Sequence, residues 1–438
     1  MNKPPPLGYR AILLFWSPLA VTWLMMASEG PFLAAIIARL PDPKPNLAAH
    51  GVAFAIAIMV EAPVIMIMSA STALAKDKLS FLKLRNFSFT LNIGITLVMA
   101  LLVFTPAMDF ISMRLIRLPA HVAALVHTAL FIMLPWPAAI GYRRFYQGLL
   151  IRGGQTRRVT YGTGIRMAGM SLVGSGLYFF SDLPGACVSA AALTSGVCLE
   201  AVAARIMANH AIRNLADSPE AGSLESPAPS YRAISRFYYP LALTSTLSLA
   251  VHPMVTFFVG QGRFPLESLA VIPVVNGLVF VFRAIGLSYQ EAMIALIGER
   301  NERYMELRNF GILLGLLVVT CLGLIAFTPL STLWFESISG LSAELAAFAV
   351  APACILSLIP GLSVLLSMQR AILVKNSRTY PVTWATIIEV GGILAIIFVG
   401  IHLFDMVGAT AAALALLLGR IAGNAYLLKP CASVLSRR

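Results

Sequence analysis

Ionisable side chains stand inside several long apolar stretches of this sequence. A charged side chain near the centre of a lipid bilayer costs roughly 3 kcal/mol. If all of these side chains were charged and unpaired, their summed cost would exceed the typical net stability of a folded protein, about 5–15 kcal/mol. We therefore expect them to face one another or water, where they would bind a charged solute or carry a proton. They are the acids Glu29, Glu61, Glu200, Glu291 and Glu389, the arginines Arg166 and Arg283, and His252.

Known enzymatic and metal-binding motifs are missing from the sequence. It contains no HExxH, GxSxG or GxGxxG pattern and no phosphate-binding P-loop. The five cysteines show no metal-ligand or CxxC spacing, so they are expected to be small apolar packing residues. We therefore expect no enzyme, no catalytic residues, no metal and no cofactor, with only a proton or a sodium ion as a coupling ion.

The composition is that of a membrane protein. Hydrophobic residues make up 58% of the chain and charged residues only 12%, whereas soluble domains are about one quarter charged. Apolar stretches long enough to cross a bilayer, about 20 residues, recur along the whole chain. The sequence predicts an all-α polytopic membrane protein with twelve spans, at 11–39, 47–75, 86–108, 120–142, 159–180, 184–212, 233–260, 266–298, 309–330, 341–369, 379–402 and 406–428.

The two halves of the chain repeat one another. Tyr9–Thr22 reads YRAILLFWSPLAVT and Tyr231–Thr244 reads YRAISRFYYPLALT, 222 residues later, with nine of fourteen positions identical. Such a repeat predicts two copies of one structural unit. Because each copy has an even number of spans, six, both copies cross the membrane in the same direction. A binding site is expected between them. The predicted domains are a six-helix lobe at 1–213, a cytoplasmic linker at 214–231 and a second six-helix lobe at 232–438.

The basic residues predict the orientation in the membrane. With the amino end in the cytoplasm, 24 of the 32 lysines and arginines fall on the cytoplasmic side and 5 on the other. The positive-inside rule demands such a bias, so the net charge of +13 needs no nucleic-acid partner. We expect both termini in the cytoplasm, a bacterial inner (plasma) membrane location, and a monomer whose partners are the lipid bilayer and a small molecule.

Equivalent positions of the repeat carry opposite charges. Glu61 corresponds to Arg283, and Arg166 corresponds to Glu389. Such positions face each other across a two-fold axis if they lie on the inter-repeat face. The charges could then form static ion pairs that hold the repeats together, or they could bind a substrate. Glu200 is expected to be a packing partner, and Arg420 to reach the cytoplasmic interface. His252 and Asn276 are further candidates for polar lining of a site.

Two twelve-span folds contain such a repeat, the major facilitator fold and the multidrug/oligosaccharide/polysaccharide flippase fold. The charges in the first, second and eighth spans favour the second fold. Within it the chain resembles the progressive ankylosis protein family, relatives of the multidrug and toxin extrusion transporters. The resemblance rests on Pro18–Thr22, on Ala48–Phe54 with Pro63, and on Pro240–Leu243 followed by Pro253. It implies an exporter of organic anions.

The sequence thus predicts a secondary active transporter working by alternating access around a central charged cavity. Arg283, with Arg166, would contact a small organic anion, and Glu29, Glu61 or Glu291 would carry the coupling proton or sodium ion. One alternative is a cation or drug extruder whose acids bind the substrate. Others are a flippase for a lipid-linked anion and a membrane enzyme or scaffold.

Overall fold

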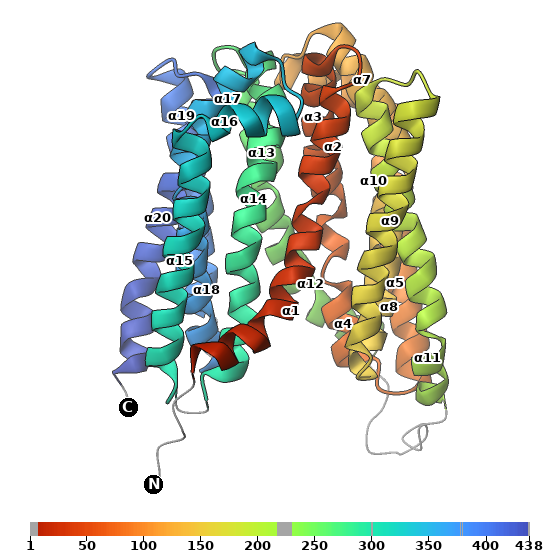
Figure 1. Cartoon of the computed structure of the whole chain (residues 1–438). Coiled ribbons are helices and arrows are strands. Elements are labelled where there is room, and N and C mark those ends of the chain that lie inside the picture. Colours follow the sequence, from red (N-terminus) through yellow and green to blue (C-terminus); the bar gives the residue numbers. More distant parts are fainter. Residues whose placement is uncertain (1–7, 217–229, 299–300, 377, 379, 437–438) are drawn as a thin grey trace. The chain divides into compact units, whose positions relative to one another are not determined.

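The computed structural model describes residues 8–216, 230–298, 301–376, 378 and 380–436, and these are almost entirely helical (Figure 1). The helices are α1 (Tyr9–Ala27), α2 (Glu29–Ala38), α3 (Pro43–Glu61), η1 (Ala62–Val64), α4 (Ile67–Leu74), α5 (Lys78–Phe104), α6 (Ala107–Asp109), η2 (Phe110–Leu115), α7 (Ala120–Ile132), α8 (Trp136–Arg152), α9 (Thr156–Phe180), α10 (Gly185–Met207), α11 (Asn209–Ala216), α12 (Tyr231–Leu249), α13 (Val251–Val259), α14 (Pro265–Leu296), α15 (Tyr304–Phe327), α16 (Leu330–Thr332), η3 (Leu333–Ile338), α17 (Ala343–Leu356), α18 (Ile359–Lys375), α19 (Tyr380–His402) and α20 (Gly408–Leu435).

Among the residues that the structure describes, eleven helical segments are long and apolar enough to cross a membrane. They are Tyr9–Ala38, Pro43–Leu74, Lys78–Phe104, Ala120–Arg152, Gly185–Met207, Tyr231–Val259, Pro265–Leu296, Tyr304–Phe327, Ala343–Lys375, Tyr380–His402 and Gly408–Leu435. The all-helical membrane architecture predicted from the sequence is confirmed. Of the twelve predicted spans, the fifth corresponds to α9, which has 25 residues but is not among the eleven. Its three arginines, Arg157, Arg158 and Arg166, lower its apolarity.

Prolines interrupt several of these segments. A proline removes the hydrogen bond to the carbonyl four residues earlier and clashes with that carbonyl. The break between α1 and α2 lies at Ser28, three residues before Pro31, and the break between α12 and α13 lies at Ala250, three residues before Pro253. Pro63 lies in the short helix η1 that separates α3 from α4. Long spans are therefore built from two shorter helices.

The chain forms two compact units, which are described separately here. The first unit contains Met1–Arg39, Pro43–Ala48 and Phe257–Arg438, and the second contains Leu40–Asp42 and Ala49–Thr256. The predicted lobes 1–213 and 232–438 stay a prediction, and most of the predicted linker at 214–231 lies outside the described residues. In these units α1 and α2 are grouped with the carboxyl-terminal helices, and α12 with the amino-terminal ones.

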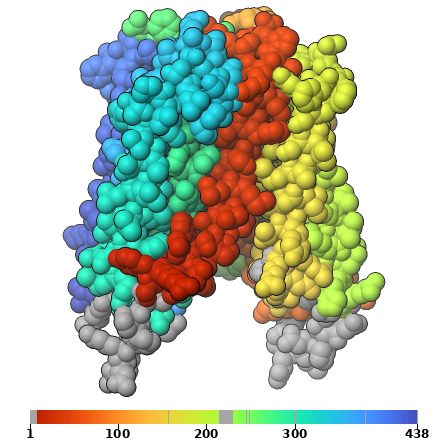
Figure 2. All heavy atoms as spheres, viewed as in Figure 1, coloured from red at the N-terminus to blue at the C-terminus, as the bar shows by residue number. Residues whose placement is uncertain are grey.

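In the first unit the opening helix α1 packs on α14 and α15. Trp16 donates a hydrogen bond from Nε1 to Ser288 Oγ at 2.8 Å, and its ring meets Phe310 edge-on, with ring centroids 5.9 Å apart. Ile12 is fully buried in the same apolar cluster. Figure 2 shows the amino-terminal helix lying against the cyan surface of α15. The apolar side of α1 is thus covered by helices from the second half of the sequence.

In the second unit α12 makes the corresponding contacts. Tyr238, the repeat counterpart of Trp16, donates a hydrogen bond to the carbonyl oxygen of Pro63. Its ring meets Phe87 of α5 edge-on, with centroids 5.4 Å apart, and Phe87 is the counterpart of Phe310. Ile234, the counterpart of Ile12, is fully buried. The opening helix of each half of the sequence therefore packs among helices of the other half.

Local backbone conformations also recur at the spacing of the repeat. Asp42 and Phe264, 222 residues apart, both adopt the left-handed conformation with φ of 50°, and each precedes a helix that begins with proline. Non-glycine residues rarely adopt positive φ. The π-helical turns η2 and η3 begin 223 residues apart. Equal geometry at equal spacing is what two copies of one unit produce.

Two equivalent glycines allow close helix pairing in the two units. A Cβ at Gly196 of α10 would lie 2.9 Å from the carbonyl oxygen of Arg166 on α9, and one at Gly419 of α20 would lie 2.9 Å from that of Glu389 on α19. Both helix pairs lie side by side in Figure 1. Such contacts between small residues let helix backbones approach closely in membranes.

We expect Gly196→Ala and Gly419→Ala to destabilise the protein by about 1–3 kcal/mol, because the added methyl group forces the paired helices apart. Gly164→Ala and Gly391→Ala on α9 and α19 are matched controls, since an added Cβ there meets nothing within 4 Å. Because alanine has a higher helix propensity than glycine, these control substitutions should be neutral or stabilise the protein by up to about 1 kcal/mol. Thermal unfolding in detergent measures all four, and equal melting temperatures would contradict the close packing.

Candidate functional site

A buried ionic cluster lies in the second unit around Glu200 of α10. Its carboxylate is fully buried and forms an ion pair with Arg143 of α8. Gln147, one turn further along α8, donates from Nε2 to Glu200 Oε1 at 2.9 Å. Arg166 of α9 places Nε 3.4 Å from Glu200 Oε2. Two helices, α8 and α9, therefore supply partners to the carboxylate on α10, which compensates much of its desolvation cost.

Glu61, the last residue of α3, belongs to the same unit and lies beside this cluster. Its side chain is only 6% exposed. Arg143, Arg144 and Arg166 are the charges that act on it electrostatically. In the described part of the chain, however, Glu61 forms no salt bridge, and its Oε2 is buried without a hydrogen-bond partner. The cluster thus holds three arginines and two carboxylates, and one carboxylate has no direct partner.

The first unit contains a second ionic cluster, between α19 and α20. Arg420 donates from Nε to Glu389 Oε1 at 2.8 Å, and its Nη2 is 2.8 Å from the same oxygen. Its Nη1 lies 3.3 Å from Ser363 Oγ on α18. Both charged side chains are nearly buried, with exposed fractions of 12% and 13%. Arg420 is therefore held inside the unit and does not extend to the cytoplasmic interface, in contrast to the expectation from its position in the sequence.

Arg283 of α14 lies near this second cluster without a carboxylate of its own. The charges that act on it come from Arg420, Glu389 and Arg370. Its guanidinium lies over the Phe280 ring, 5.9 Å from the centroid. Across the described residues Arg283 forms no salt bridge, and its buried Nε has no hydrogen-bond partner. Three arginines thus lie around one carboxylate in this cluster.

The two clusters have reversed polarity. In the second unit the arginine stands on α9 and the acid on α10; in the first unit the acid stands on α19 and the arginine on α20. Arg166 and Glu389 occupy equivalent repeat positions, whereas Glu200 and Arg420 are offset by about one turn. The counterparts Gln147 and Gln369 are both buried and both donate toward these helices, Gln369 to the Asn424 carbonyl oxygen at 3.0 Å.

The remaining predicted residues lie apart from these ion pairs. Glu29 is half-buried in the first turn of α2, and the adjoining Gly30 and Pro31 contact α14 at Gly277, next to the half-buried Asn276. Glu291 is exposed on α14 and hydrogen-bonded to Trp23 of α1. His252 is exposed in the first turn of α13.

The structure gives Arg166 and Glu389 partners inside their own units, Glu200 and Arg420. Glu61 and Arg283 belong to different units, so their predicted mutual contact stays a prediction. Glu29 and His252 are likewise in different units.

Several cluster residues were not among the predicted site residues. They are Arg143, Arg144, Gln147, Glu200, Arg370 and Arg420. The predicted fourth and tenth spans ended at residues 142 and 369, whereas α8 continues to Arg152 and α18 to Lys375. Arg143, Arg144 and Arg370 were therefore assigned to cytoplasmic loops. The matching glutamines Gln147 and Gln369, with Arg144 three residues before the first and Arg370 directly after the second, were the available signal.

No model of a known protein family matches the sequence, and no curated protein matches it. Solved structures do share its fold. An inward-facing multidrug resistance MATE family transporter of the MOP superfamily superposes with a TM-score of 0.68 at 14% identity, covering 95% of this chain and 96% of that chain. The lipid II flippase MurJ in an inward closed conformation gives 0.69 at 13% identity, covering 97% and 90%.

A third similar structure is a MOP superfamily transporter from Pyrococcus furiosus, described as having a binding pocket of reverse polarity that suggests a different function. It gives a TM-score of 0.63 at 15% identity and covers 96% of each chain. The predicted flippase-superfamily (MOP) fold is confirmed by these likenesses. The three proteins are described as transporters and a flippase.

We expect Glu200→Ala to lower the stability of the protein by about 3–5 kcal/mol, because it leaves buried guanidinium groups without their carboxylate. Glu344→Ala is the control, since that side chain is 80% exposed and an exposed ion pair contributes about 0–1 kcal/mol. Thermal unfolding in detergent provides the comparison. Equal melting temperatures for the two variants would show that Glu200 does not hold α8, α9 and α10 together.

Proposed function

We propose that this protein is a secondary active transporter that exports small organic anions by alternating access. The excess of arginine over carboxylate in both buried clusters carries the proposal. The second unit gathers Arg143, Arg144 and Arg166 around Glu61 and Glu200. The first unit gathers Arg283, Arg370 and Arg420 around Glu389. Uncompensated positive charge within a membrane is stabilised by an anionic ligand.

The fold comparisons support the transporter part of this proposal. A MATE family transporter and the flippase MurJ share the fold over nearly the whole chain. We extend the architecture to twelve spans in two parallel six-helix repeats by counting α9 as a span. Its 25 residues at 1.5 Å per residue reach about 37 Å, more than the hydrocarbon core of about 30 Å. Membership in the progressive ankylosis family, with its organic anion substrates, is part of the same proposal.

Arg283 is the residue we assign to the substrate. It is the arginine of the first unit's cluster that has neither a hydrogen bond nor a salt bridge among the described residues. A guanidinium offers five donors in a fork that matches carboxylate or phosphate. Arg166 would contact the substrate secondarily, since Glu200 already engages it. Glu61, Glu29 or Glu291 would carry the coupling proton or sodium ion.

The excess of arginines distinguishes this proposal from a cation or drug extruder. A cation or drug extruder would need carboxylates in excess where the substrate binds. A flippase for a lipid-linked anion also needs arginines, and the likeness to MurJ keeps it as the second candidate. A flippase would move only lipid-linked anions, whereas the proposed exporter moves water-soluble ones. We further propose a monomer in a bacterial inner membrane with both termini in the cytoplasm; the terminal residues 1–7 and 437–438 lie outside the described residues.

In proteoliposomes, the wild-type protein should transport water-soluble organic anions from a panel that also contains cations and neutral solutes. Arg283→Ala should lower anion transport at least tenfold, and Arg283→Lys should rescue it poorly because the bidentate geometry is lost. Arg263→Ala is the matched control in the same unit, because the Arg263 side chain is 55% exposed. Melting temperatures should stay close to that of the wild type.

Normal anion transport by Arg283→Ala would refute the assignment of this residue, and transport of cations alone would favour the drug extruder. Translocation of lipid-linked anions without any transport of soluble ones would favour the flippase. All of these transport activities are measured in the same vesicles. The melting temperature of each variant shows separately whether it has folded, so that a folding defect is not taken for a change of substrate.

Single cysteines introduced into a cysteine-free background test the orientation. We expect a membrane-impermeant thiol reagent added outside intact cells to label Pro45→Cys, at the start of α3, but not Ser223→Cys in the predicted cytoplasmic linker. The reason is the strong bias of basic residues to the predicted cytoplasmic side. The reverse labelling pattern would invert the proposed topology.

A further inference from the structure

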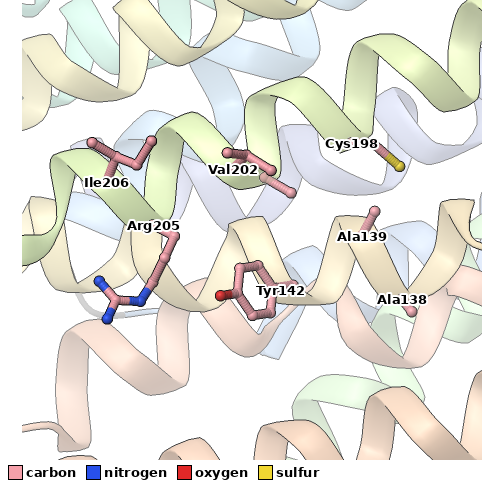
Figure 3. A pocket seen from close by; sticks show the side chains of 8 residues that line it. Ala138, Ala139, Tyr142, Cys198, Val202, Arg205 and Ile206 are labelled. Carbon is pink, nitrogen blue, oxygen red and sulfur yellow. The ribbon is translucent and has the colours of Figure 1, made fainter.

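An open groove runs along the second unit between α8 and α10, with a volume of about 480 Å³ (Figure 3). Small side chains leave this space, since Ala138 and Ala139 stand on one wall and Cys198 and Ala201 on the other. The volume lies within the usual range of ligand pockets, roughly 300–1,000 Å³. Tyr142, Val202, Arg205 and Ile206 complete the lining.

The groove faces the outside of its unit. Val202 and Ile206 are 59% and 62% exposed, whereas Glu200 on the opposite face of α10 is fully buried. Both walls belong to helical segments long and apolar enough to cross a membrane. An exposed apolar surface on such a segment is covered by lipid chains. The occupant of the groove is therefore a molecule of the bilayer.

One end of the groove is positively charged. Arg205 stands in the last turn of α10, and its guanidinium lies 5.3 Å from the centroid of the Tyr146 ring. Arg85 of α5 acts on the same ring electrostatically. Arg205 also donates to Asn209 Oδ1, but within the described ranges neither arginine forms a salt bridge with a carboxylate. Figure 3 shows the Arg205 side chain beside Tyr142.

We propose that this groove binds an anionic glycerophospholipid, with one acyl chain between α8 and α10 and the phosphate on Arg205. The apolar wall matches the acyl chain of such a lipid, and the charged end matches its phosphate. The two features follow one another along α10 as they do along the lipid. A basic residue near the membrane surface attracts anionic lipid with a few-fold gain in affinity, and Arg85 adds to the positive potential. This site belongs to one unit alone and is independent of the proposed transport activity.

Native mass spectrometry of the detergent-purified protein tests the proposal with phosphatidylglycerol and phosphatidylcholine carrying the same acyl chains. We expect the protein to bind phosphatidylglycerol in preference. Arg205→Gln should weaken that binding about fivefold and weaken phosphatidylcholine binding less, because choline offsets the charge of the phosphate. Ala138→Leu fills the groove and should weaken both lipids. Arg213→Gln, on the exposed neighbouring helix α11, should change neither, and glycerol phosphate without acyl chains should not bind.

Three results would overturn the proposal. Equal binding of the two lipids would rule out the contact between Arg205 and the headgroup. Undiminished binding by Ala138→Leu would show that the lipid does not occupy the groove. Binding of glycerol phosphate at the affinity of the lipid would show a simple anion site. The melting temperature of each variant without added lipid identifies any that fails to fold. In that case Cys198, which lines the groove, provides a second measurement in the wild type: phosphatidylglycerol should slow its alkylation by an apolar maleimide more than phosphatidylcholine does.

Discussion

The cost of burying charge in a membrane determines how both units are assembled. Glu200 is fully buried, and partners from α8 and α9 converge on it. Glu389 receives both Nε and Nη2 of Arg420, which in turn reaches Ser363 of α18. Breaking such a pair costs more than the pair contributes, so the helices that carry these side chains cannot separate or rotate independently. The ionic clusters therefore fix the relative positions of three helices in each unit.

Reversed polarity follows from the same constraint. A cluster needs its own charges to be compensated, and either helix of a pair can supply the acid. Arg166 and Glu389 stand at equivalent positions of the repeat and carry opposite charges. The glutamines Gln147 and Gln369 are also equivalent, and both donate hydrogen bonds to the neighbouring helix. The sign of the remaining charge is the same in both units, however, since arginines outnumber carboxylates in each. The excess charge, more than the polarity of any one pair, supports the anionic substrate that we propose.

Much of the fold was predictable from the sequence, and much of the site was not. Apolar length and the repeat at Tyr9 and Tyr231 predict the helical membrane architecture, because both signals are read directly from residue types and their spacing. The ends of α8 and α18 were misplaced because hydropathy treats an arginine as a loop signal, although Arg143 is buried against Glu200. The packing of α1 on Phe310 depends on contacts between segments far apart in the chain, which no local pattern records.

The location of each cluster within a single unit separates structural charges from those that are available to a substrate. The alternating access that we propose would require helices to move relative to one another, and an ion pair inside one compact unit would survive a movement of that unit as a whole. Arg143 and Arg166 with Glu200, and Arg420 with Glu389, meet that description. Glu61 and Arg283 differ, because neither has a salt bridge among the described residues of its own unit. Glu61 still lies among Arg143, Arg144 and Arg166 of its own unit, whereas Arg283 lies near two further arginines and one carboxylate. In the transporter that we propose, Arg283 is therefore the charge that an anionic substrate would compensate, and a charge whose partner changes can couple binding to movement.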